Sequence, residues 1–175
     1  MRTRLSCDPH SGELVVRVTY ISGLDIGFGA CLLAVLIWLS YIDIKTYRLP
    51  NALTFPLIGL GLVQARMFDN YMLPHIAGAV AGYLIFYLVE IAFKASTGKD
   101  GLGRGDAKLL AAGGAWCGVL SLPTIILIAS LSGLLLIMIL KLWKKIPTSN
   151  IQIPFGPFLA LAIGSVWFIQ HFYYF

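Results

Sequence analysis

The sequence predicts an all-α fold: a polytopic bundle of about six transmembrane helices. Three observations lead to this prediction: 58% of the 175 residues are hydrophobic, only 12% are charged, and the mean hydropathy is +0.83. Soluble domains contain about twice that share of charged residues. Because one helical crossing of a bilayer needs about 20 apolar residues, a chain of this length holds roughly six crossings and no separate soluble domain.

The first 25 residues differ in composition from the rest of the chain. Residues 1–25 mix charged side chains with short apolar patches, and we expect a polar N-terminal tail there. Within the tail, residues 14–21 fit either a strand or a surface helix. No apolar run follows the first basic residues as it would in a signal peptide. We therefore expect membrane insertion to depend on the helices of residues 26–175.

Apolar segments follow the tail, separated by charged residues, prolines or glycines. The expected helices are residues 26–42, 52–65, 74–93, 107–120, 123–142 and 158–175. The second of them is short and contains Pro56, so we expect it to span only a thin bilayer or to cross at a tilt.

The third apolar segment, residues 74–93, contains two features of its own. Gly78 and Gly82 form a GxxxG pattern, which lets helices approach closely in lipid, and we interpret it as a packing contact. Glu90 lies near the end of the segment. We expect its side chain to reach the membrane interface or to pair with Lys94.

The distribution of Lys and Arg predicts how the bundle is oriented. If all the expected segments cross, nine basic residues share one side: Lys45, Arg48, Lys94, Lys99, Arg104, Lys108, Lys141, Lys144 and Lys145. The other side has four: Arg2, Arg4, Arg17 and Arg66. Since cytoplasmic loops are enriched in Lys and Arg, we place the first side in the cytoplasm. The same enrichment accounts for the net charge of +5, and we expect no binding to nucleic acid.

Two Asp residues lie at this expected cytoplasmic edge. Asp43 ends the first segment and Asp106 precedes the fourth, so that two intervening crossings return the chain to the same side. Gly103 and Gly105 predict a tight turn that delivers Asp106 directly before a helix beginning at Ala107. The simplest structural interpretation is an N-cap. An ionisable group at the edge of a long, almost uncharged helix is also a candidate functional residue.

Paired carboxylates are suited to peptide hydrolysis or to cation binding. In hydrolysis, an ionised carboxylate takes a proton from water, while its protonated partner polarises the scissile carbonyl and later protonates the amine. Close placement and burial raise one pKa, so a pair that shares a proton is stable near neutral pH. The sequence leaves open which Asp starts ionised. The alternative is a small membrane carrier or assembly factor whose paired acids bind a proton or cation, although no convincing internal repeat is visible.

Three stretches of the chain resemble the type IV prepilin peptidases, a family of GxGD membrane aspartic proteases. They occur in the family's order: YIDIKTYRLPN at 41–51, GLGRGDAKLLAAGGAWCG at 101–118 and IPFGPFLA at 153–160. The resemblance implies that Asp43 and Asp106 are the catalytic pair, in the inner membrane of a bacterium. The implied substrates are prepilins or pseudopilins, the pilin-like secretion proteins, cleaved on the cytoplasmic side after a short basic leader and before an apolar helix.

Further residues in these stretches are expected to bind substrate or to shape the site. They lie within a few residues of an Asp: Pro50, Asn51, Gly103, Gly105 and Lys108. We expect the first two to shape the turn after the first segment, and the glycines to let an extended substrate backbone come close. Lys108 is expected either to hold a carboxylate or to anchor its helix at lipid headgroups. For residues 153–157 a structural role is favoured.

The cysteines and histidines predict neither a metal site nor a cofactor. The three cysteines form no CxxC pair, and no HExxH occurs. Many prepilin peptidases also methylate the new N-terminus and carry a cytoplasmic insert with two CxxC pairs that resembles a zinc site. The loop from Asp43 to Asn51 is too short for such an insert. We therefore expect a short form that cleaves without methylating and without zinc. The oligomeric state does not follow from the sequence.

Overall fold

The computed structural model describes residues 2–7, 14–19, 23–68, 71–98, 103–143 and 154–173. Within these ranges it contains six α-helices: α1 (Gly23–Thr46), α2 (Asn51–Phe68), α3 (Leu73–Thr97), α4 (Arg104–Cys117), α5 (Leu122–Leu142) and α6 (Gly156–Tyr173). A 3-10 turn, η1 (Val119–Ser121), precedes α5. The predicted all-α bundle is confirmed for residues 26–175 as far as they are described.

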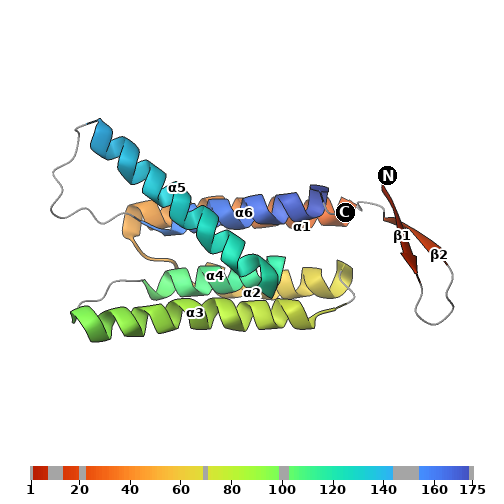
Figure 1. Ribbon diagram of the computed structural model, residues 1–175, viewed down its shortest axis with the longest axis horizontal. Helices are drawn as coiled ribbons and strands as arrows, with labels where there is room; N and C mark the ends of the chain where they lie inside the picture. The colour runs from red at the N-terminus through yellow and green to blue at the C-terminus, as the bar shows by residue number, and fades with distance from the viewer. Residues whose placement is uncertain are drawn as a thin grey trace.

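The N-terminal tail contains a β-hairpin. Strands β1 (Arg2–Cys7) and β2 (Leu14–Thr19) pair antiparallel, with Arg2 opposite Thr19 and Cys7 opposite Leu14. The sequence allowed a strand or a surface helix for residues 14–21, and the described part, residues 14–19, is a strand. Figure 1 shows the hairpin apart from the helices.

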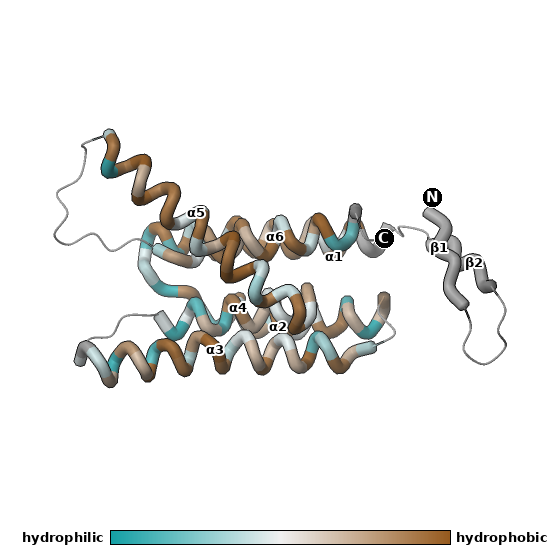
Figure 2. The backbone as a smooth tube through the Cα atoms, in the orientation of Figure 1, coloured by the Kyte–Doolittle hydropathy of each residue, from teal (hydrophilic) through white to brown (hydrophobic). Residues whose placement is uncertain are grey.

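Successive helices of the bundle run in opposite directions (Figure 1). α1, α3 and α5 end at the end of the bundle where α2, α4 and α6 begin, and we call it the Asp43 end because Asp43 lies in the last turn of α1. α5 crosses the others obliquely. Figure 2 shows hydrophilic residues around the loop that joins α1 to α2 at this end, while α5 is hydrophobic along most of its length.

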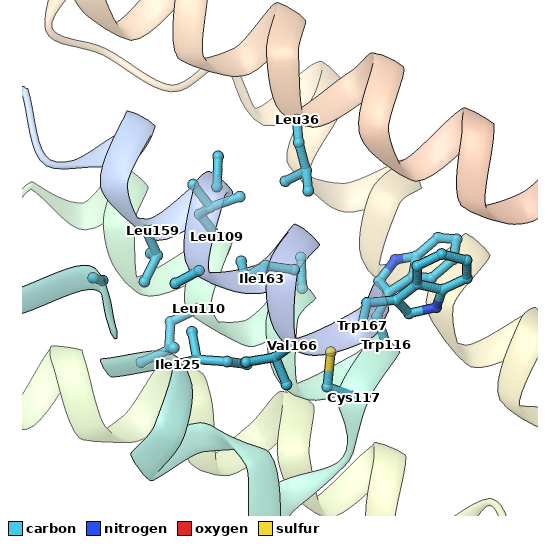
Figure 3. Packing of buried hydrophobic residues seen from close by; sticks show 14 of the residues in the cluster. Leu36, Leu109, Leu110, Trp116, Cys117, Ile125, Leu159, Ile163, Val166 and Trp167 are labelled. Carbon is cyan, nitrogen blue, oxygen red and sulfur yellow. The ribbon is translucent and has the colours of Figure 1, made fainter. Parts of the chain in front are cut away.

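α4 lies at the centre and packs against α2, α3, α5 and α6. All its residues from Leu109 to Cys117 are buried. Figure 3 shows side chains of α4 packed with Ile163 and Trp167 of α6. The buried indole of Trp116 donates its N–H to the carbonyl oxygen of Leu57 at 2.8 Å, which satisfies the one polar group of that side chain.

α3 approaches α4 through the two glycines of its GxxxG pattern. A Cβ atom at Gly82 would lie 2.7 Å from the carbonyl oxygen of Leu110, and one at Gly78 would collide with the backbone of Gly114. Because any side chain at these positions would push the helices apart, the interpretation of GxxxG as a packing contact is confirmed.

Within the described residues, three helices are long and apolar enough to cross a membrane. They span Ile26–Thr46, Leu73–Ser96 and Val119–Leu142, and Gly156–His171 forms a shorter apolar helix. α2 and α4 do not meet the same criterion, although the 18 residues of α2 extend about 27 Å, close to the thickness of a bilayer core. The protein is therefore a membrane protein, and six crossings remain a prediction.

Candidate active site

Asp43 lies inside α1, one turn before its end, and not beyond the helix as the sequence predicted. α1 continues to Thr46. Tyr47 then ends it in a left-handed conformation, with φ 52°, and donates its N–H to the Asp43 carbonyl at 2.8 Å. The helical period places Asp43 on the same face as Leu36 and Leu39, both buried. That face of α1 points toward the interior of the bundle, so Asp43 is only 5% exposed.

Asp106 lies in the first turn of α4, which begins at Arg104, three residues before the predicted start. The Asp106 N–H donates to the carbonyl oxygen of Gly103 at 3.0 Å, and its side chain caps no N–H group of the helix. The simplest structural interpretation of Asp106, an N-cap, is therefore wrong, because Gly103 occupies that position. The position is an early helical one, which leaves the carboxyl available for other contacts.

Gly103 and Gly105 provide space, and not the unusual backbone conformation that the sequence predicted. Gly103 has φ −74° and ψ 128°, which any residue can adopt, and Gly105 is helical. A Cβ atom at Gly105 would lie 2.9 Å from Cβ of Leu49, so the α1–α2 connection packs directly on the start of α4. Gly103 is exposed, and a Cβ atom there would lie 3.6 Å from Oδ2 of Asp106.

The two predicted carboxyls come together at the Asp43 end. Burial of the Asp106 carboxyl raises its pKa from 3.8 to about 7, and the nearby charge of Asp43 contributes a smaller part of this increase. A carboxyl in this state keeps its proton near neutral pH beside an ionised neighbour. This is the asymmetry that acid–base catalysis by two carboxyls requires.

Gly156 is a third member of the site, and sequence reasoning missed its contact with Asp43. It is the first residue of α6, and its N–H donates to Oδ2 of Asp43 at 3.0 Å in a buried position. A Cβ atom at Gly156 would lie 2.5 Å from the same oxygen and 3.0 Å from Cγ. Glycine therefore allows the helix to start against the carboxylate. The sequence signal was present in residues 153–157, for which a structural role was the favoured interpretation.

Asn51 and Lys108 also come together, across the interface of α2 and α4. Nζ of Lys108 donates to Oδ1 of Asn51 at 2.6 Å and lies 5.6 Å from the centroid of the Phe55 ring. Pro50 precedes α2, and its carbonyl accepts the N–H of Leu53 at 3.1 Å, which starts the helix. The sequence led us to expect that Lys108 either holds a carboxylate or anchors its helix at lipid headgroups. Among the described residues, it instead contacts the amide oxygen of Asn51 and the ring of Phe55.

Glu90 and Arg104 connect the end of α3 to the start of α4. Oε1 of Glu90 lies 3.4 Å from Nε of Arg104, a partner that the sequence did not suggest. The Arg104 side chain is 74% exposed, so this ion pair contributes little to stability on its own. Arg104 is the first residue of α4, so the pair joins α3 to the turn that carries Asp106.

Metal ligands do not cluster in the part of the chain that the structure describes. No group of three or more His, Cys, Asp or Glu residues there is placed to hold a metal ion. Cys31 is exposed and Cys117 buried, on different helices.

A membrane-embedded helix bundle with two coupled carboxyls at one end is the class of protein that this fold and site define. Residues 30–138 match the model of the type IV leader peptidase family, and this range includes both Asp43 and Asp106. The chain therefore belongs to that family.

Curated relatives carry the name prepilin leader peptidase/N-methyltransferase. The relative from Xanthomonas campestris pv. campestris is 46% identical over 146 residues, which cover 81% of this chain and 50% of the relative. The one from Escherichia coli strain K12 is 45% identical over 126 residues, which cover 70% of this chain and 54% of the relative. The one from Neisseria gonorrhoeae is 40% identical over 149 residues, which cover 79% of this chain and 50% of the relative. The chain thus spans about half the length of these relatives. No solved structure was found to be significantly similar.

Proposed function

We propose that this protein is a membrane-embedded aspartic endopeptidase that removes the leader peptide from type IV prepilins or pilin-like secretion proteins. One observation supports it most: Asp43 and Asp106 lie near each other at one end of the bundle, where burial and the Asp43 charge raise the pKa of Asp106 to about 7. Family membership and the names of the relatives support the choice of substrate.

The reaction that fits this pair is hydrolysis by an activated water molecule. The ionised carboxylate takes a proton from water, the water oxygen bonds to the scissile carbonyl carbon, and the protonated carboxyl donates to the carbonyl oxygen. The C–N bond then breaks as one carboxyl gives a proton to the leaving amine, while the other, now a carboxylate, takes a proton from a hydroxyl group of the tetrahedral intermediate as the new carboxyl group of the product forms. The pair ends with the single proton with which it began, so no cofactor is needed. Exposed Gly103 beside the Asp106 carboxyl leaves room for an extended substrate backbone.

The site is proposed to face the cytoplasm from the inner membrane of a bacterium. Of the described basic residues of the helix bundle, six lie around the Asp43 end: Lys45, Arg48, Lys94, Arg104, Lys108 and Lys141. At the opposite end of the described bundle, α2 carries Arg66 in its last turn. Enrichment of Lys and Arg on the cytoplasmic side then supports an inward-facing site.

Leader removal tests the proposal directly. Membranes that contain the protein are mixed with a candidate prepilin, and the loss of the leader is scored on a gel. Asp43→Asn and Asp106→Asn should each abolish cleavage while the protein accumulates normally, because both substitutions remove an essential proton carrier at nearly constant volume. Asp100→Asn is the matched control, since Asp100 precedes α4 in the sequence, lies outside the described residues and is not expected to take part in the site. Near wild-type cleavage by either site variant would show that the pair is wrongly assigned. A carrier or assembly factor would cleave nothing.

A further inference from the structure

The surroundings of the two carboxyls differ. Oδ2 of Asp43 accepts the Gly156 N–H, and because α6 begins at Gly156, the positive end of the helix dipole lies beside the same oxygen. A backbone N–H binds an ionised carboxylate more strongly than a protonated carboxyl. Among the described residues, no hydrogen-bond donor acts on the Asp106 carboxyl; its pKa is governed by burial and by the Asp43 charge.

We propose that Gly156 is a positioning residue that makes Asp43 the ionised, water-activating member of the pair and leaves Asp106 as the member that carries the proton. This inference rests on the proposed peptidase function. In the reaction, Asp43 then takes the proton from water while the new C–O bond forms, and Asp106 donates to the carbonyl oxygen. The pKa of Asp106, raised to about 7, agrees with this division.

The start of α6 is held in place by aromatic packing, so the Gly156 amide is a fixed donor. The ring of the preceding Phe155 lies 6.2 Å from that of Phe86 on α3 and 6.4 Å from that of Phe158. The Phe155 carbonyl accepts the N–H groups of Phe158 at 3.1 Å and Leu159 at 3.2 Å, which closes the first turn. The donor is therefore positioned before any substrate arrives, as preorganised electrostatic stabilisation requires.

The same contact makes any side chain at residue 156 incompatible with the observed position of Asp43. A methyl carbon 2.5 Å from Oδ2 and 3.0 Å from Cγ would overlap the carboxylate, which must then move and lengthen its hydrogen bond to the amide. A misplacement of about 1 Å in a catalytic group lowers the rate by roughly 100-fold. Gly156 has no positive φ, and Ala favours helix more than Gly does, so the backbone itself tolerates Gly156→Ala.

The first test compares Gly156→Ala with Gly133→Ala on α5, where an added Cβ would meet the Phe158 ring at an ordinary 3.7 Å. Gly156→Ala should lower kcat by about 100-fold with little change in KM. The acid side of its pH–rate profile should also move to higher pH, because the ionised form of Asp43 loses a donor. Gly133→Ala should behave as wild type. An unchanged kcat and pH profile in Gly156→Ala would overturn the proposal.

A second test does not depend on how well the Gly156 variant folds. Infrared spectra of protein labelled with ¹³C at the Asp carboxyls, recorded at pH 6, report the carbonyl band of a protonated carboxyl. That band should disappear in Asp106→Asn and persist in Asp43→Asn. The opposite pattern would assign the proton to Asp43 and refute the inference. If wild-type protein cleaved no prepilin, the proposed function would fail, whereas normal cleavage with either contrary result would reject only the role of Gly156.

Discussion

Cleavage should slow as the pH rises through 7, since the proposed mechanism requires a proton on Asp106. Burial and the charge of Asp43 raise the pKa of this carboxyl to about 7, so it keeps its proton up to neutral pH and loses it above. The protonated fraction falls from about 0.9 at pH 6 to about 0.1 at pH 8, which predicts a roughly tenfold decrease in kcat. At an unshifted pKa of 3.8, less than about 0.1% would be protonated at pH 7.

The assay uses detergent-solubilised protein and a peptide that spans the leader junction, at saturating concentration and constant ionic strength. Initial rates are measured from pH 5 to pH 9. Returning a sample from pH 8.5 to pH 6 should restore the rate, which separates titration from denaturation. The peptide is used with blocked termini, because a free α-amino group would titrate near pH 8, and its Lys and Arg side chains stay charged over this range. A flat rate from pH 6 to pH 9, or a midpoint below pH 5, would refute the raised pKa as the controlling titration.

The remaining predictions concern the pairing of the acids, the contact between α2 and α4, and the second activity in the relatives' names. Cysteines placed at Asp43 and Asp106, in a background without the native cysteines, should crosslink with a short reagent; no crosslink would contradict the pairing. Lys108→Met should remove its bond to Asn51 and lower the thermal unfolding temperature by roughly 2–4 °C, equivalent to about 1 kcal/mol, whereas Asn51→Asp should preserve stability. If Lys108→Met were as stable as wild type, the hydrogen bond between Lys108 and Asn51 would not contribute to stability. Mass spectrometry of prepilin processed in the presence of a methyl donor should show no added methyl group, and a zinc chelator should leave the rate unchanged. A methylated product or inhibition by the chelator would overturn the expectation drawn from the short connection between α1 and α2.

The placement of the two acids at one end of the bundle could be predicted from the sequence. It depends only on local composition and on the number of helical segments between Asp43 and Asp106. Long apolar runs must be helical in lipid, where every backbone polar group needs a partner within its own segment. An even number of segments between Asp43 and Asp106 then returns the chain to the same side. The class of membrane protein was predictable for the same reason, since hydropathy is a property of each segment alone.

The ends of the helices and the contacts of the site were decided by tertiary packing. α1 continues past Asp43 because that face is buried against the bundle, and α4 starts at Arg104, where Leu49 packs closely on Gly105. The Gly156 amide meets Asp43 across 113 residues of chain. No local propensity encodes such a contact, since it exists only after α6 has packed beside α1 and brought a helix N-terminus to a buried carboxylate.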